Sequence, residues 1–524
     1  MGNTQNSTHL STFKKILLIL TIVLIITTIR LYPTYQYSSE PDSYMGAEVL
    51  KQNTIITTGH LPSLGRGEAL LSVYNLEKQL IIPSFPLYEQ YIYSFFLGVT
   101  FILIIILFAR HRSDRSESQL DTKSLVTLTI FGLCATPDII MNLGGWNGPY
   151  AWVFLFLFLY YAVYKEHTIT NMGLAIFFLL LLPIAYFTIA LITGGILLTT
   201  LCYQTMFNKE VIPRSLIIFY TIFFIGYQIY ATVFGFGLLV NIDDIVFSYF
   251  EGSSRILELR YILGGSRISF FACALSNLLA CIPLFIFALR GYEDRDSKSY
   301  SLIIILILTL AIMSAGFYLW MGYYGVVQRI PYLAVLSSIL AVALMVRTGF
   351  IKERSSKNIK FKTIIVLSIV CAVVISNIFN VSSEYYEQKI EFTEAAGLTW
   401  LKENSLPEEI IFTDFRLAGS LIAHKNPTLF IDDNAMPPER VNWLLENIYY
   451  NEGDPIEALD QIKTNEGRTS DILLFSEKYT RYPGIKGYDN IFQPASKDFF
   501  DPFMRNASIN LIYRNDETIV LKNN

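Results

Sequence analysis

Acidic residues placed just beyond apolar segments are the first candidates for chemistry in this sequence. Glu40 and Asp42 follow the first apolar segment, in Glu40-Pro41-Asp42. Asp138 follows Pro137 in an otherwise apolar stretch. A carboxylate held at a membrane surface can take a proton from a hydroxyl group or bind a metal ion. The alternatives are a solvated loop acid for Glu40 and Asp42, and a helix cap for Asp138.

Two further residues have side chains suited to substrate binding. Arg329 is the only basic residue in the turn between two late apolar segments, and Pro331 follows it. A guanidinium can hold a phosphate with two parallel hydrogen bonds, although Arg329 could also be an anchor at the membrane surface. His60 is isolated in Gly59-His60-Leu61-Pro62, so a structural role is its alternative.

The composition indicates what kind of protein must position these residues. Of the 524 residues, 52% are hydrophobic and only 16% are charged, and the mean hydropathy is +0.42. Soluble folds rarely cover so much apolar surface with so few charges. All five cysteines fall in apolar stretches and no CxxC spacing occurs, so no disulfide framework or cysteine metal site is expected. A soluble enzyme, a nucleic-acid-binding protein and a disulfide-rich secreted module are all disfavoured.

Apolar segments long enough to cross a bilayer recur over residues 16–380, and they predict eleven transmembrane helices. One apolar run, 171–207, is too long for a single span. The Gly194-Gly195 step after Pro183 predicts a tight turn inside it. The predicted spans are 16–32, 91–109, 124–141, 150–164, 171–189, 190–207, 215–238, 268–289, 301–320, 331–349 and 363–380.

Lysines and arginines give the predicted orientation. With a cytoplasmic N-terminus, 18 of those near the spans lie inside and eight lie outside, which satisfies the positive-inside rule. An odd number of spans then places the C-terminal part outside. The first apolar segment lacks a small-residue cleavage site, so we expect it to remain as a helix. The sequence therefore predicts a multi-pass protein of the cell membrane with an extracytoplasmic C-terminal domain.

Two domains are expected. Residues 1–383 form the transmembrane domain, with outer loops 33–90 and 239–267, and residues 384–524 form the outer domain. The outer part carries 24 acids against 14 Lys and Arg, so the two parts differ in charge. Its pattern predicts a small α/β domain with helices at 394–403, 417–424 and 438–450, strands at 410–413, 428–431 and 472–475, and a closing hairpin of 510–513 with 518–521 around Asn515-Asp516.

This layout resembles the GT-C class of membrane glycosyltransferases, which take a sugar from a polyprenyl-phosphate carrier at the extracytoplasmic face. The resemblance rests on Asp42 soon after the first helix, Asp138 after the third, Arg329 before Pro331, and a C-terminal outer domain. The stretches 395–404 and 512–516 also resemble those of archaeal members. The resemblance implies an α-helical polytopic membrane protein of about eleven transmembrane helices, GT-C-like, with a soluble C-terminal α/β domain.

The resemblance also implies roles for the candidate residues. Asp42 would be the catalytic base or the carboxylate that organises a metal ion, and Asp138 would be a second acid of the same cavity. Arg329 would bind the carrier phosphate. Glu40 and His60, in the same outer loop as Asp42, are further substrate-binding candidates. A divalent cation, Mg²⁺ or Mn²⁺, would be held by Asp42 and Asp138.

The expected activity is inverting hexosyl transfer from a polyprenyl- or dolichyl-phosphate-linked sugar to a lipid-linked glycan or a protein acceptor, within a membrane and without nucleic acid. An oligosaccharyltransferase-like protein is one alternative, but the sequence lacks a Trp-Trp-Asp-x-Gly-Tyr string and an Asp-x-Asp pair at Asp138. A lipid-linked glycan flippase or transporter is another alternative. Transporters usually show half-repeats and ionisable residues in mid-helix, and the predicted spans show neither.

Overall fold

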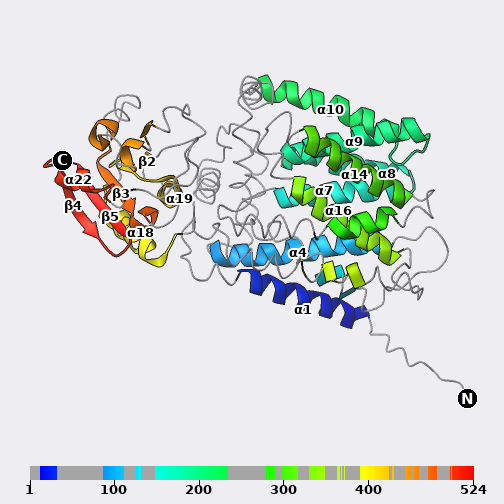
Figure 1. The fold of residues 1–524 in the computed structure, drawn as a ribbon, viewed down its shortest axis with the longest axis horizontal. Helices are drawn as coiled ribbons and strands as arrows, with labels where there is room; N and C mark the ends of the chain where they lie inside the picture. The colour runs from blue at the N-terminus through cyan, green and yellow to red at the C-terminus, as the bar shows by residue number, and fades with distance from the viewer. Residues whose placement is uncertain are drawn as a thin grey trace, which may run out of the picture.

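The computed structural model contains, in its described residues, a bundle of eight long helices and an α/β unit (Figure 1). The bundle helices are α1 (Thr12–Leu31), α4 (Pro86–Arg110), α7 (Gly148–Tyr164), α8 (Ile169–Ala185), α9 (Phe187–Phe207), α10 (Arg214–Val233), α14 (Lys298–Gly316) and α16 (Ile330–Arg347). The structure describes residues 12–31, 86–110, 148–185, 187–233, 298–316 and 330–347 and, with gaps, parts of 125–130, 279–289, 363–371 and 390–523.

Each of the eleven ranges predicted as spans contains helix in its described residues. Eight of the ranges coincide with the continuous helices, and shorter helical pieces lie in 124–141, 268–289 and 363–380. Among the described residues, Ile189–Phe207 is the helix that is long and apolar enough to cross a membrane, with a mean hydropathy of 1.5 over 19 residues. Six shorter apolar helices accompany it: Gly98–Ala109, Ala151–Tyr164, Ile169–Pro183, Arg214–Ile229, Lys298–Met313 and Leu333–Val346.

The apolar run 171–207 forms two helices that run in opposite directions. Tyr164, at the end of α7, donates a hydrogen bond to Ser299 at 3.0 Å, and Tyr203, near the end of α9, lies 3.1 Å from the Ser301 hydroxyl. Both serines are in the first turn of α14, so α7 and α9 end at the same level. Since α8 alone is 17 residues long, about 25 Å at 1.5 Å per residue, α9 must return along the direction of α8.

The turn between these two helices is not where the glycine pair predicted it. Helix α8 ends at Ala185 and α9 begins at Phe187, so Gly194 and Gly195 lie inside α9. A Cβ atom added at Gly195 would come within 3.1 Å of the Met313 sulfur in α14. The absence of a side chain therefore lets two helices approach each other. The prediction of a turn at the glycines was wrong because their effect here is on packing between helices.

Basic residues predicted to be cytoplasmic share one end of the bundle. Phe108 of α4 packs against Tyr164 with ring centroids 5.5 Å apart, so α4 ends beside the end of α7 and the start of α14. Arg110, Lys165, Arg214 and Lys298 are at or next to these helix ends. Figure 1 shows α1 starting at the end of the bundle away from the α/β unit and running towards that unit. The side of the membrane that each end faces stays a prediction.

The outer surface of the bundle carries exposed aliphatic side chains. Ile218, Ile222, Ile225 and Ile229 form a stripe along α10, and each is between 55% and 67% exposed. Their spacing places them on one face of the helix. A large exposed apolar stripe is unfavourable in water but is the ordinary surface of a helix that contacts lipid chains. The stripe is therefore consistent with a helix that lies in a bilayer.

The α/β unit contains a five-stranded sheet in its described residues, in the order β2-β1-β3-β5-β4. Strand β1 pairs in parallel with β2 and β3, and β5 pairs antiparallel with β3 and β4. The predicted boundary at 383/384 lies outside the described residues. The elements are α18 (Phe392–Asn404), β1 (Ile411–Phe412), α19 (Phe415–Ala423), β2 (Thr428–Leu429), β3 (Ile472–Ser476), the 3-10 helix η6 (Glu477–Thr480), α22 (Asp501–Arg505), β4 (Ile509–Arg514) and β5 (Thr518–Asn523).

Both faces of the central strands are buried. Ile472 and Leu474 of β3 face a cluster that includes residues of α18 and α19. Leu473 and Phe475 face the opposite cluster, with Phe499 and residues 443–449. A strand covered on both faces is mostly apolar, which is why residues 472–475 of β3 appear in the sequence as a short continuous apolar run.

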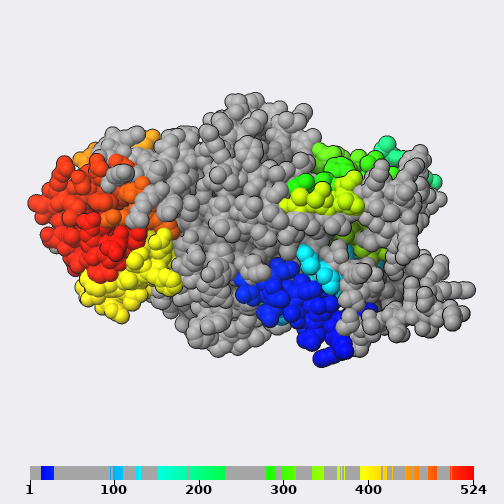
Figure 2. Space-filling view, turned by 60° about the horizontal axis from the view of Figure 1, so that its bottom comes forward, coloured from blue at the N-terminus to red at the C-terminus, as the bar shows by residue number. Residues whose placement is uncertain are grey.

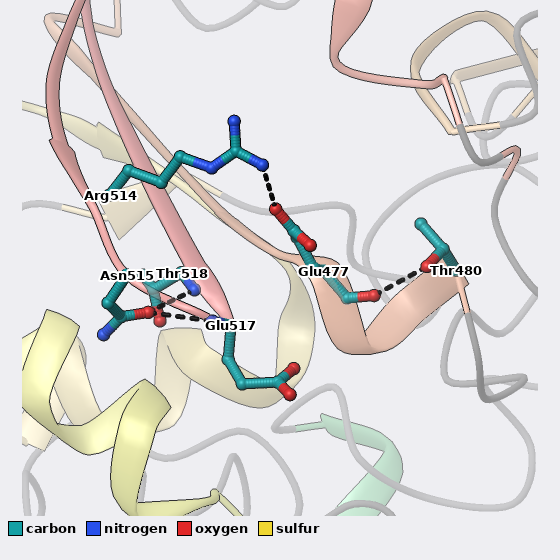
Figure 3. Close-up of polar contacts among 6 residues, drawn as sticks. All are labelled: Glu477, Thr480, Arg514, Asn515, Glu517 and Thr518. Atoms are coloured by element: carbon teal, nitrogen blue, oxygen red, sulfur yellow. Dashed lines mark hydrogen bonds and ion pairs between the residues drawn. The ribbon is translucent and has the colours of Figure 1, made fainter.

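The predicted closing hairpin is present as β4 and β5, and Asn515 explains its turn. Figure 3 shows the Asn515 side-chain oxygen accepting hydrogen bonds from the backbone N–H groups of Glu517 at 2.9 Å and Thr518 at 2.7 Å. The side-chain amide donates to the Thr393 carbonyl in α18 at 2.7 Å. Arg514 adds an ion pair with Glu477 at 2.8 Å. Asn515 therefore both closes the turn and connects it to a helix 122 residues earlier.

Candidate functional site

The five predicted site residues, Glu40, Asp42, His60, Asp138 and Arg329, lie outside the described residues. Their convergence in one cavity therefore stays a prediction. The structure does describe the helices that flank them. Helices α1 and α4 bracket the segment with Glu40, Asp42 and His60, whereas Asp138 precedes α7 and Arg329 directly precedes α16.

The segment that carries Asp42 is attached to one end of the bundle. Figure 1 shows α1 ending, and α4 beginning, at the end that faces the α/β unit. Leu31 is the last residue of α1 and Pro86 is the first residue of α4. Both attachment points thus lie at the end opposite to Lys298. A site formed by this segment on the outer side of the membrane requires both attachment points to lie at the same end of the bundle.

The described bundle helices contain almost no acidic residues. Their one acid is Glu89, in the first turn of α4. Asp42 and Asp138, the predicted catalytic acids, belong to segments that connect the described helices.

The described residues contain no group of three or more His, Cys, Asp or Glu side chains that could hold a metal ion. Two of the polar contacts described in the bundle lie at the basic end. Lys298 donates to the Val163 carbonyl at 3.3 Å, and Gln204 donates to the Ile212 carbonyl at 2.6 Å. These bonds satisfy backbone carbonyls where helices end, so we assign them a structural role.

The α/β unit contains a buried group of charged side chains where α18 begins. Glu394 is fully buried, accepts a hydrogen bond from the Ser476 hydroxyl and accepts the Glu391 backbone N–H at 2.8 Å. Lys478, whose side chain is 4% exposed, pairs with Glu391 at 3.0 Å. The bond from Glu391 to Glu394 is one half of a capping box, a spacing visible in the sequence. The bond from Ser476 to Glu394 and the ion pair of Lys478 with Glu391 join the start of α18 to β3 and η6, so we assign these contacts a structural role.

A second ion pair connects the segment after α18 to the last strand. Lys522 donates to Glu409 at 2.6 Å, with side-chain exposures of 43% and 10%. Burial alone would raise the pKa of Glu409, but hydrogen bonds from Lys522 and from the Leu406 backbone, with the Lys522 charge, outweigh it and lower the pKa. The hydrogen bond to Glu409 and the negative charge of Glu409 raise the pKa of Lys522. The pair is a titratable contact outside the bundle.

Comparisons with known proteins reveal similar folds. A scan against protein-family models and a search of curated protein sequences found no match. Among solved structures, the chain is similar to ArnT from Cupriavidus metallidurans bound to undecaprenyl phosphate, with a TM-score of 0.54 and 10% identity over 98% of each chain. It is also similar to the apo oligosaccharyltransferase of Archaeoglobus fulgidus, with a TM-score of 0.55 and 13% identity over 90% of this chain and 71% of that chain.

Both similar proteins are GT-C glycosyltransferases. This chain has the GT-C membrane glycosyltransferase fold. The apo state of ArnT gives the same result, with a TM-score of 0.54 over 97% of this chain and 98% of that one. The predicted mostly helical, GT-C-like fold is confirmed, whereas the number of transmembrane helices stays a prediction.

Proposed function

We propose that this protein is a membrane glycosyltransferase that transfers a sugar from a polyprenyl-phosphate carrier to a lipid-linked glycan or protein acceptor at the extracytoplasmic face. The observation that carries the proposal is the similarity to ArnT along 98% of both chains, because that structure holds undecaprenyl phosphate. The attachment of the Asp42 segment to the bundle end that faces the α/β unit supports it. Because the described helices contain almost no acids, we place the catalytic carboxylate in the same segment.

In the proposed reaction, Asp42 takes the proton from an acceptor hydroxyl. The hydroxyl oxygen forms a bond to the anomeric carbon of the sugar while the bond from that carbon to the carrier phosphate breaks, which inverts the anomeric centre. Arg329 offsets the negative charge that develops on the leaving phosphate. Glu40 and His60 would bind substrate, and Asp138 would be the second acid of the cavity.

A divalent cation is part of the proposal. Carboxylate oxygens are the ligands that Mg²⁺ and Mn²⁺ prefer, and Asp42 with Asp138 would supply them. A cation bound there would stabilise negative charge on the carrier phosphate. Transfer that continues unchanged after chelation and dialysis would remove the cation from the proposal and leave Arg329 as the phosphate partner.

Oligosaccharyltransferase-like transfer is the second candidate, because the Archaeoglobus enzyme has a similar fold. Transfer of a single sugar is preferred over it for two reasons. The ArnT match covers both chains almost completely, whereas this chain covers 71% of the oligosaccharyltransferase. The sequence also lacks the Trp-Trp-Asp-x-Gly-Tyr string.

The first test is mass spectrometry of surface glycans from cells that lack this chain, complemented with wild type, Asp42→Asn or Asp501→Asn. Asp501 is an exposed acid of α22 and is the matched control. We expect one terminal sugar to be lost and to be restored by wild type and Asp501→Asn, but not by Asp42→Asn. Loss of the entire glycan would favour whole-glycan transfer or flipping. Rescue by Asp42→Asn would place the base elsewhere, with Glu89 the next residue to replace.

A transfer assay on the purified protein in vesicles without an ion gradient separates an enzyme from a transporter. Removing a general base should lower the rate by on the order of 10²–10⁴-fold. Asp42→Asn is therefore expected to show such a loss at unchanged expression. Movement of labelled lipid between leaflets without sugar transfer would contradict the enzyme proposal.

A further inference from the structure

The α/β unit presents an Asn-x-Ser motif between α22 and β4, Asn506-Ala507-Ser508. This pattern is the acceptor sequence for N-linked glycosylation. Figure 1 shows α22 and β4 at the pole of the unit farthest from the helical bundle, and Figure 2 shows that pole, in red, as open molecular surface. A large polar group attached there would meet no part of the bundle.

Asn506 is half-buried, and the hydrogen bonds at this turn do not use its side-chain nitrogen. The Asn506 carbonyl accepts the Ile509 N–H at 3.0 Å, and its side-chain oxygen accepts the Ser508 N–H at 2.9 Å. Both bonds use oxygen atoms. The amide nitrogen Nδ2, which would carry a glycan, has no hydrogen-bond partner among the described residues.

The residues around the motif combine exposure with a firm anchor. Ala507 and Ser508 are exposed, and the Ser508 hydroxyl also makes no hydrogen bond to a described residue. Phe503 and Ile509, on either side, are buried in the same apolar cluster. The turn is therefore held from both ends, and a hydrophilic substituent on Asn506 would extend into solvent without displacing either anchor.

We propose that Asn506 carries an N-linked glycan on the extracytoplasmic face. The donor is a polyprenyl-phosphate- or pyrophosphate-linked glycan, used by an oligosaccharyltransferase of the cell. Asn506 Nδ2 forms the bond to the anomeric carbon and loses one proton, while the bond from that carbon to the phosphate oxygen breaks and the lipid phosphate leaves with its electron pair. The inference requires the α/β unit to face outside and does not depend on the activity proposed for this chain.

The test is glycopeptide mass spectrometry of the full-length protein purified from its native cells. We expect the peptide with Asn506 to carry the mass of a glycan. The modification should disappear in Asn506→Gln and Ser508→Ala and persist in Ser508→Thr, because threonine also completes the motif. The matched control is Asn510→Gln, which replaces an exposed asparagine of β4 outside any such motif and should keep the glycan.

An unmodified Asn506 peptide in the wild-type protein would overturn the proposal. Protease digestion of sealed vesicles then identifies the reason. A unit that is digested from outside would mean that this turn is not an acceptor, and a protected unit would mean that the orientation is wrong. Asn506→Gln should retain wild-type sugar transfer, so a failure of this inference is distinguishable from a failure of the proposed function.

Discussion

Gly397 shows how closely single residues pack in the α/β unit. A Cβ atom added to it would lie 2.6 Å from Thr518 Cγ2 and 2.8 Å from Thr518 Cβ. Nearby, the Trp400 ring stacks on Tyr513 with centroids 4.7 Å apart. Helix α18 therefore sits directly on the β4–β5 hairpin, and only a glycine permits this distance.

Gly397→Ala is expected to destabilise the protein by about 1–3 kcal/mol, since the overpacking cost exceeds the helix preference of alanine. Thermal unfolding of the full-length protein measures it. The control is Gly173→Ala in α8, where an added Cβ meets nothing within 4 Å, and it should unfold at or above the wild-type temperature. Adding Thr518→Ser, which removes the closest carbon, should restore part of the loss. An unchanged Gly397→Ala protein would contradict this packing.

The pair of Glu409 and Lys522 predicts a pH dependence. Folding lowers the pKa of Glu409 below its ordinary 4.5, so the stabilisation is present above pH 4.5 and is lost as the pH falls through the folded-state pKa. Folding raises the pKa of Lys522 above 10.5, so its contribution is present below pH 10.5 and is lost as the pH rises further. The pair therefore stabilises the unit across the neutral range.

Glu409→Gln is expected to lower stability at neutral pH and to flatten the decline below pH 4.5. Urea unfolding of the α/β unit in the full-length protein, followed at several pH values, measures both effects. The matched control is Asp501→Asn, which removes an exposed pair with Arg505 and should keep the wild-type acid profile. An equally steep acid decline in Glu409→Gln would mean that other carboxylates cause it.

Among the elements, α9 is the helix whose glycines lie against two neighbouring helices. Tyr220 of α10 donates to the Ala190 carbonyl at 2.7 Å, while Met313 of α14 approaches Gly195. The two contacts lie on different faces of the same helix segment. Helix α9 therefore contacts α10 through a hydrogen bond and α14 through close van der Waals packing at a glycine.

Replacing the two neighbouring glycines of α9 tests this arrangement. Gly195→Ala should destabilise the bundle by on the order of 1 kcal/mol, because the Met313 sulfur would lie 3.1 Å from the new methyl group. Gly194→Ala is the matched control, since its nearest atom, on Tyr220, is at an ordinary 3.9 Å. Thermal unfolding in detergent measures both. In proteins that also carry Met313→Ala, the Gly195→Ala and Gly194→Ala variants should unfold at similar temperatures. Equal unfolding temperatures of the two single variants would contradict the close approach of α14.

For the whole molecule, the main consequence of the fold is that the two ends of the helical bundle differ. The connection after α7, with Lys165, lies beside Lys298 at the basic end of the bundle. Figure 1 shows the α/β unit beyond the opposite end. If the bundle spans the membrane, these two parts of the molecule lie on different sides of it.

An epitope inserted after Glu166 and one fused after Asn524 are therefore expected to be accessible from opposite faces of sealed cells. By the positive-inside rule, the second should be the one labelled on intact cells. Antibody binding before and after permeabilisation measures both, and a wild-type level of sugar transfer controls for correct folding. Labelling of both epitopes on intact cells would contradict the arrangement.

The pattern of residues along the chain predicts most of the helices and strands. Long apolar runs form helices because backbone groups in lipid or in an apolar core have to bond within the segment. The described residues contain every strand expected in the α/β unit, because short apolar runs and turn residues such as Asn515 act over a few residues. The residue types of the candidate site, Asp42, Asp138 and Arg329, also came from the sequence.

Contacts between residues far apart in the sequence follow from the three-dimensional packing and could not be predicted from local patterns. Gly194 and Gly195 lie inside α9 and not in a turn, since α10 and α14 pack against them. Ser476 reaches Glu394 across 82 residues of sequence. Such pairs follow from how helices and strands are stacked, and no local pattern encodes them. For the same reason, the sequence cannot show whether Asp42, Asp138 and Arg329 form one site, because segments between different helices must bring them together.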